Sequence, residues 1–357
     1  MAKVTIEGPR TKDNVTQSMG MNVLEAAKWR INKIIDRYDS VCVAFSGGKD
    51  SLAVMHLLKQ VYEERGLDRK VQAIFRDEEL IPDHVIDFVD HYRQLPWVDL
   101  KWFCVPLKSS KFIFGKSIDY VQWDNKREWV RQKPEWAIND LSGTVYDQYT
   151  MDDKVAEYFN GKLCVMTGIR TTESLTRYRA VINKINETFV CATQTKRVNL
   201  GRPIYDWTED DVFKFFYDYG IAYAPIYDMQ SAAGHSLRVS TPLHAESAKT
   251  LDKWRELDPY FYERVLKVFP EVAIQAKYFN EIESLTSDAP EPTNWQELEM
   301  WIKESYEGEQ IILAQKRFKE VMQFQKNPDV AHKYPFDYVW GKFKSGVIKC
   351  VFLPESN

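Results

Sequence analysis

The segment whose residues are best suited to binding and catalysis is a glycine turn that carries two serines, a lysine and an aspartate. An apolar run at 41–45 precedes this turn and an apolar, helix-like run at 52–58 follows it. This order predicts a buried strand, a tight turn and a helix. The inward N–H groups, the helix dipole, the hydroxyls and the ammonium all favour an anion, so we expect a phosphate site. The turn reads Ser46-Gly47-Gly48-Lys49-Asp50-Ser51.

The turn resembles the pyrophosphate loop, S-G-G-x-D-S, of the N-type ATP pyrophosphatase (PP-loop) superfamily. It lacks the spacing of a Walker A motif, and an ordinary glycine-rich turn is the alternative interpretation. The superfamily includes phosphoadenosine phosphosulfate (PAPS) reductases, the small subunit of bacterial ATP sulfurylase, and ATP-dependent ligases and thiolases. The resemblance implies an α/β fold with a doubly wound, mainly parallel sheet of the adenine nucleotide alpha hydrolase type. It also implies either cleavage of ATP between the α and β phosphates or binding of a PAPS-like adenine nucleotide.

A second motif follows the strand-like run 162–166 and carries two arginines and a glutamate. It reads Gly168-Ile169-Arg170-Thr171-Thr172-Glu173-Ser174-Leu175-Thr176-Arg177. In an open parallel sheet, ligands bind beyond the carboxyl ends of the strands, where this motif and the glycine turn would both lie. Arg170 and Arg177 would clamp phosphate or sulfate oxygens while Glu173 orients an arginine, although a surface ion pair is the alternative. The motif is similar to the second signature of PAPS reductases.

These motifs define a predicted nucleotide site and a predicted catalytic set. Arg76 and Asp77 follow the strand-like run 71–75 and are placed to meet adenine or ribose, although an exposed charged turn is the alternative. The predicted nucleotide-binding residues are Ser46, Gly47, Gly48, Lys49, Asp50, Ser51, Arg76, Asp77, Gly168, Ile169, Arg170 and Glu173. The predicted catalytic residues are Lys49, Asp50, Arg170 and Arg177.

Each catalytic residue has an expected role in adenylation. Lys49 would neutralise charge on departing pyrophosphate, and Mg²⁺, contacted by Asp50, would share that charge. Arg170 and Arg177 would steer the negative group of an acceptor onto the α-phosphorus. The products would be an adenylated oxyanion and pyrophosphate.

A third segment, 201–212, resembles the PAPS reductase pattern P-I-x-D-W-[ST]-x-x-D-[VI]. Thr208 is a good helix N-cap, and three acidic residues follow it where the helix dipole favours negative charge. Asp206 and Trp207 have two interpretations, which are packing between layers and contact with a substrate.

The chain departs from true reductases at the cysteines that carry their chemistry. It has no C-x-x-C pair and no E-C-G-x-H segment near the C-terminus, and reduction of a sulfonucleotide needs a thiolate. We therefore expect no iron–sulfur cluster and no zinc. Cys42, Cys104 and Cys164 lie in apolar runs and are predicted core residues. The five cysteines are Cys42, Cys104, Cys164, Cys191 and Cys350.

The pattern along the chain predicts two domains after a short extension. We expect an N-terminal extension over 1–20, a PP-loop nucleotide-binding domain over 21–242 and a helical C-terminal domain over 243–357. Strand-like and helical runs alternate in the second segment, which favours a parallel sheet with helices on both faces. Residues 108–150 break the alternation and contain three tryptophans, so we expect an irregular lid or substrate-facing insertion there.

Charge and hydropathy limit the kinds of partner that we expect. Residues 101–202 hold 17 Lys or Arg and 11 Asp or Glu, a balance of +6 in a chain of net charge −4. A local positive field suits a polyanionic nucleotide and leaves nucleic acid open as a partner. The first twenty residues are polar and no apolar run has the length of a membrane span, so we expect a cytoplasmic protein without membrane contact.

The run from Tyr223 to Gly234, continued by 237–242, resembles one branch of PAPS reductase-like proteins of bacteria and phages. This branch is called the immunoglobulin-binding-regulator A type, and the resemblance covers residues 20–270. It implies a ParB/sulfiredoxin-like protein partner, and we also expect a homo-oligomer.

Three functions stay open. The favoured one is an ATP pyrophosphatase that uses ATP and Mg²⁺ to adenylate an acceptor such as sulfate or a nucleic-acid group. The second is a PAPS reductase-type sulfonucleotide enzyme of sulfur metabolism that uses Cys350 or an external thiol. The third is a nucleotide-sensing regulatory module with a protein or DNA partner.

Overall fold

The computed structural model divides the chain into two compact units. It describes residues 3–4, 17–18, 20–113, 116–173, 177, 189–232, 251–274, 290–306, 308–344, 348 and 352. The first unit comprises the described parts of Met1–Lys111, Asp119–His244 and Lys253–Val268. The second comprises those of Phe112–Ile118, Ala245–Asp252 and Phe269–Asn357.

Strands and helices alternate along most of the first unit. The strands are β1 (Lys3–Val4), β2 (Gln17–Ser18), β3 (Ser40–Ala44), β4 (Val71–Arg76), β5 (Val98–Cys104), β6 (Leu107–Ile113), β7 (Lys116–Gln122), β8 (Ile138–Asn139), β9 (Leu163–Met166), β10 (Val190–Ala192) and β11 (Val198–Gly201). The helices in the described part of residues 20–274 are α1 (Val23–Arg37), α2 (Lys49–Glu64), α3 (Asp83–Gln94), α4 (Thr150–Ala156), α6 (Glu209–Tyr219), α7 (Ile226–Ala232), α8 (Leu251–Leu257) and α9 (Pro259–Val268), with a 3₁₀ turn, η2, at Thr171–Glu173.

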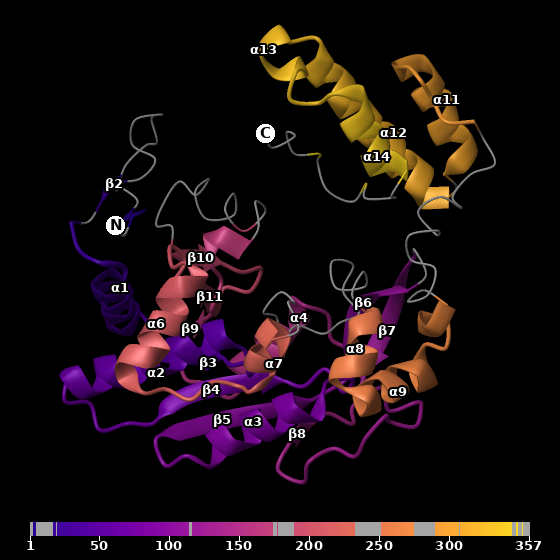
Figure 1. Cartoon of the computed structure of the whole chain (residues 1–357). Helices are drawn as coiled ribbons and strands as arrows, with labels where there is room; N and C mark the ends of the chain where they lie inside the picture. The colour runs from indigo at the N-terminus through magenta and orange to yellow at the C-terminus, as the bar shows by residue number, and fades with distance from the viewer. Residues whose placement is uncertain are drawn as a thin grey trace. The chain divides into compact units, whose positions relative to one another are not determined.

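A seven-stranded sheet forms the centre of the first unit. Its order is β10-β11-β9-β3-β4-β5-β8, and neighbouring strands pair in parallel except the edge strand β10, which is antiparallel to β11. In Figure 1, β3, β4 and β5 lie side by side with α2 and α3 along them. Strand β3 pairs with β4 on one side and β9 on the other, so the loops after all three strands leave at the same edge.

The sheet is covered on both faces, as the predicted α/β doubly wound fold requires. Successive strand residues point to opposite faces, and β3 follows this alternation. Val41 and Val43 belong to a core with α1, α2, α3 and α6, whereas Cys42 belongs to a separate core with Met151 and Val155 of α4. The predicted fold is therefore confirmed.

The tryptophan-rich segment is more regular than the sequence suggests. The prediction of an irregular stretch over 108–150 is wrong for its first part, because β6 and β7 form a two-stranded sheet. Residues 123–149 are mostly turns and loops, and β8 within them joins the main sheet beside β5. Glu79, buried and with φ of 61°, holds this segment. Its carboxylate accepts hydrogen bonds from Arg127 at 2.6 and 2.8 Å and from the backbone N–H of Trp123 at 2.6 Å.

The second unit is helical where it is described after residue 290. Its helices are α11 (Trp295–Ser305), α12 (Gly308–Gln325), α13 (Pro328–Ala331) and α14 (Phe336–Lys344). Leu298, Ile302, Val321 and Val339 lie in its apolar core. In both units, none of the helices within the described ranges has the length and apolar character needed to cross a membrane.

A buried ion pair joins α1 to the loop before α6. Arg30, with a fully buried side chain, donates to both carboxylate oxygens of Asp206 at 2.7 and 2.8 Å and to the carbonyl of Pro203 at 2.7 Å. Trp207 Nε1 donates to the carbonyl of Val23 at 3.0 Å. Asp206 and Trp207 thus hold layers together. Thr208 caps α6, as the sequence predicts.

Replacing Arg30 tests this role. Arg30→Met should lower the free energy of unfolding by about 3–5 kcal/mol, because it leaves the Asp206 carboxylate buried without its cation. Urea denaturation measures the change. Lys28→Met is the matched control on the same helix, since Lys28 pairs with Glu64 at the surface. A loss for Arg30→Met no larger than for the control would contradict the structural role.

Candidate functional site

The glycine turn forms a compact loop between β3 and α2. Gly47 has φ of 76°, a conformation that glycine adopts without strain, and Gly48 is the N-cap of α2. Ser51 Oγ donates to the carbonyl of Gly48 at 2.9 Å and accepts from the backbone N–H of Ser46 at 3.2 Å. The serine hydroxyl therefore closes the loop on itself and holds it against the first turn of the helix.

The loop after β9 touches this first turn. A Cβ atom placed on Gly168 would lie 2.5 Å from the backbone carbon of Asp50 and 2.6 Å from the backbone nitrogen of Ser51. Only glycine fits such an approach. The two predicted motifs are therefore in direct contact, as expected for loops at one edge of a parallel sheet.

Arg170 links the two motifs through charge. Its Nε donates to Asp50 Oδ1 at 2.7 Å, and its Nη1 donates to Thr172 Oγ1 at 3.1 Å. Its Nη2 lies 3.6 Å from Glu173, which also pairs with Arg177. Arg170 is buried, whereas 46% of the Arg177 side chain is exposed. Arg170 thus orders the site, and Arg177 is accessible to a ligand.

Lys49 is buried at the start of α2. Its neighbours are Asp50 of the same turn and two residues distant in the sequence, Glu209 and Tyr227. Its Nζ lies 3.0 Å from Glu209 Oε1 and 3.5 Å from Asp50 Oδ2. The same ammonium lies 5.2 Å from the centre of the Tyr227 ring, and the Lys49 backbone N–H donates to the Tyr227 hydroxyl at 2.8 Å. A cation and a helix N–H therefore converge on one point, where Glu209 and Tyr227 supply their acceptors.

Two predicted nucleotide contacts have other partners in the structure. Arg76 pairs with Asp152 of α4 at 2.6 Å. Asp77 is buried, accepts from Trp102 Nε1 at 2.8 Å and pairs with Arg131. Both side chains hold neighbouring elements, and their contact with adenine or ribose stays a prediction. Ile169 is half-buried.

Asp50, whose role as a Mg²⁺ ligand stays a prediction, faces two cations in this arrangement. One of its carboxylate oxygens accepts from Arg170 and the other faces the Lys49 ammonium. Within the ranges that the structure describes, no three His, Cys, Asp or Glu side chains gather so that they could hold a metal ion.

The sequence did not single out Glu209 and Tyr227 as site residues. Glu209 looks like an ordinary acidic residue of a first helical turn, and Tyr227 lies 178 residues from the lysine whose N–H it accepts. The only signal was the inclusion of Tyr227 in the run from Tyr223 to Gly234, which the family resemblance marked without a role.

The described cysteines are buried, which confirms the prediction that Cys42, Cys104 and Cys164 are core residues. Burial raises the pKa of Cys42 to about 12 and is the main cause that raises the pKa of Cys104 and of Cys164. Cys191 is also buried. Cys350 lies outside the described residues.

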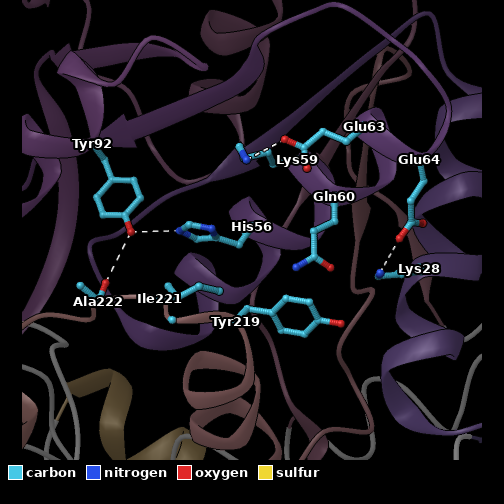
Figure 2. A pocket seen from close by; sticks show the side chains of 11 residues that line it. Lys28, His56, Lys59, Gln60, Glu63, Glu64, Tyr92, Tyr219, Ile221 and Ala222 are labelled. Atoms are coloured by element: carbon cyan, nitrogen blue, oxygen red, sulfur yellow. Dashed lines mark hydrogen bonds and ion pairs between the residues drawn. The ribbon is translucent and has the colours of Figure 1, made fainter.

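A separate pocket of about 650 Å³ lies along the later turns of α2 and contains none of the predicted site residues (Figure 2). His56 Nε2 lies 3.0 Å from the Tyr92 hydroxyl. Burial is the main cause that lowers the pKa of His56 to about 4, with a further lowering by Lys59, while Glu63 opposes it. The pocket is lined by Lys28, His56, Lys59, Gln60, Glu63, Glu64, Tyr92, Tyr219, Gly220, Ile221 and Ala222.

The sequence matches one known family over most of the first unit. The profile of the phosphoadenosine phosphosulfate reductase domain matches residues 40–265. YbdN of Escherichia coli strain K12, an uncharacterised protein, is 28% identical over 261 residues, which cover 67% of this chain and 63% of that relative. This chain therefore matches less than two thirds of the length of the relative.

Solved structures with similarity to this chain include two nucleotide enzymes. The PAPS reductase of Candida auris, solved as a phosphate complex, has a TM-score of 0.35 and 10% identity, and the match covers 62% of this chain and 92% of that one. The FMN adenylyltransferase of Candida glabrata, solved with FMN and an ATP analogue, has a TM-score of 0.40 and 12% identity, and covers 57% and 59%.

Gly168→Ala tests the contact between the two motifs. The added methyl group meets backbone atoms that cannot rotate away, so the free energy of unfolding should fall by about 1–3 kcal/mol. Gly341→Ala in α14 is the control, because a Cβ there meets nothing within 4 Å. Thermal and urea unfolding of both variants give the comparison. Equal stability of Gly168→Ala and the native protein would contradict the close approach.

The low pKa of His56 makes the stability depend on pH. The pKa of His56 is about 4 in the folded state against an ordinary 6.5, so the unfolded state binds the proton more readily. The contribution of His56 to the free energy of unfolding is therefore complete above pH 6.5 and is lost as pH falls toward 4. From about pH 7.5 to about pH 5 this loss amounts to about 2 kcal/mol. His56→Gln should remove that part of the pH dependence in urea denaturation, while His91→Gln, at an exposed position, should retain it. If the free energy of unfolding of His56→Gln and of the native protein changed equally with pH, the role of His56 in the pH dependence would be refuted.

Proposed function

This chain belongs to the phosphoadenosine phosphosulfate reductase domain family, and we propose that it binds ATP, cleaves it between the α and β phosphates and adenylates an acceptor. The observation that carries this proposal is the convergence of the Lys49 ammonium, the first N–H groups of α2 and the Arg170–Glu173–Arg177 chain on one sheet edge. Such a set of cations and N–H donors suits a polyphosphate.

The reaction needs these groups to act at different points of the nucleotide. The loop N–H groups and Lys49 would hold the β and γ phosphates. An oxyanion of the acceptor would attack the α-phosphorus, and the bond from that phosphorus to the oxygen bridging the β phosphate would break. Lys49 would stabilise the negative charge that develops on pyrophosphate as it leaves. Exposed Arg177 would attract the acceptor, while buried Arg170 would keep Asp50 and Glu173 in position.

The reductase alternative has less support from the described residues. Attack on a sulfonucleotide needs an accessible thiolate. Cys42, Cys104 and Cys164 are buried with raised pKa values, so each remains a neutral thiol, and buried Cys191 is not accessible. A reductase would depend on Cys350 or on an external thiol.

Lys49→Met tests the proposed function. We expect release of pyrophosphate from MgATP by the native protein, assayed with and without sulfate and nucleic acid, and a loss of about a hundredfold or more in the variant. Methionine keeps an unbranched side chain of similar size near Tyr227 and removes the ammonium. Lys59→Met, in the same helix but ten residues further on, is the matched control.

The outcomes separate the three functions. Release that depends on Lys49 and not on Lys59 supports adenylation. ATP binding without release under every condition would favour the nucleotide-sensing module. Release of sulfite from PAPS that Cys350→Ser abolishes would favour the reductase.

A further inference from the structure

The hydroxyl of Tyr227 lies where the loop would hold a phosphate oxygen. It accepts the 2.8 Å hydrogen bond from the Lys49 backbone N–H, which belongs to the first turn of α2 and has no acceptor within the helix. A Cβ atom on Gly48 would lie 3.4 Å from this hydroxyl. The hydroxyl therefore lies within van der Waals range of the N-terminus of the helix.

Tyr227 cannot leave this position by a small movement of its side chain alone. It is 2% exposed, and its ring packs near Phe213 and Tyr223. The backbone N–H of Tyr227 also donates to the carbonyl of Ala224 at 3.2 Å. Exchange of its hydroxyl for another acceptor therefore requires a shift of the segment that carries it, α7.

Glu209 supplies an oxygen acceptor to the Lys49 ammonium, as Tyr227 does to the Lys49 backbone N–H. Its carboxylate lies 3.0 Å from Nζ, although 46% of its side chain is exposed to solvent. Two side chains of the segment 209–227 thus supply oxygen acceptors to Lys49, one to its backbone N–H and one to its ammonium. These are the two kinds of donor that a phosphate chain would use.

We propose that Tyr227 and Glu209 are internal competitors of the polyphosphate, so that the structure is a closed state which a nucleotide opens by displacing the Tyr227 hydroxyl. This inference rests on the proposed function, because it concerns the same loop. Phosphate oxygens are ionised and form stronger hydrogen bonds with N–H donors than a neutral hydroxyl does. Burial raises the pKa of the Tyr227 hydroxyl, which keeps it neutral.

Tyr227→Phe tests the competition directly. The substitution keeps the ring in its packing and removes only the hydroxyl, so the affinity for ATP and for inorganic pyrophosphate should rise about fivefold. Isothermal titration calorimetry on the full chain measures both. Tyr223→Phe is the matched control, because the Tyr223 hydroxyl bonds to Asp228 and not to the loop. Glu209→Gln is a second variant that should also bind more tightly.

The outcomes separate this inference from the proposed function. Unchanged or weaker binding in both Tyr227→Phe and Glu209→Gln, with binding intact in the native protein, would overturn the competition and leave the proposed function standing. Tighter binding without pyrophosphate release would support the competition and count against adenylation. No binding by the native protein or by either variant would overturn both. If Tyr227→Phe unfolds, as circular dichroism would show, Glu209→Gln decides alone.

Discussion

The contact of Gly168 with the first turn of α2 is the constraint on which the site depends. Because β3 and β9 are neighbouring parallel strands, the loops that follow them leave at one edge of the sheet. The missing side chain at Gly168 brings these loops within van der Waals contact. Arg170, two residues further on, can then reach Asp50 at 2.7 Å. The ion pairs of the site therefore depend on the pairing of β3 with β9.

Several ion pairs in the first unit have an architectural role. Arg30 and Asp206 join α1 to the α6 loop, and Glu79 holds the tryptophan-rich segment. Buried charges are stable only when they are paired and hydrogen-bonded, and these groups satisfy that condition. Some of the Lys and Arg residues that give 101–202 its positive balance form ion pairs with carboxylates of the loop after β4. Three pairs show this, namely Lys111 with Glu78, Arg131 with Asp77 and Arg127 with Glu79.

The loop site differs from these pairs, because some of its paired side chains are about half exposed to solvent. Lys49 faces Glu209, half of which is in solvent, and Arg177 is equally exposed. Phosphate oxygens, which form strong charge-assisted hydrogen bonds, would replace the Glu209 carboxylate at Lys49. The pocket along α2 also contains lysines, Lys28 and Lys59, but it is lined by later turns of α2 and not by the N-terminus of a helix, and His56 is neutral. A polyanion therefore favours the loop.

The sequence by itself determined the α/β fold, the strand–turn–helix at 41–58 and the cap at Thr208, because apolar periodicity, glycine and capping residues act over a few neighbouring positions. It also marked the two motifs that meet at Gly168. Only the tertiary structure decided that Asp77 faces Trp102 and that Tyr227 reaches Lys49 across 178 residues. Such partners depend on how strands pair and helices pack, and no local pattern carries that information.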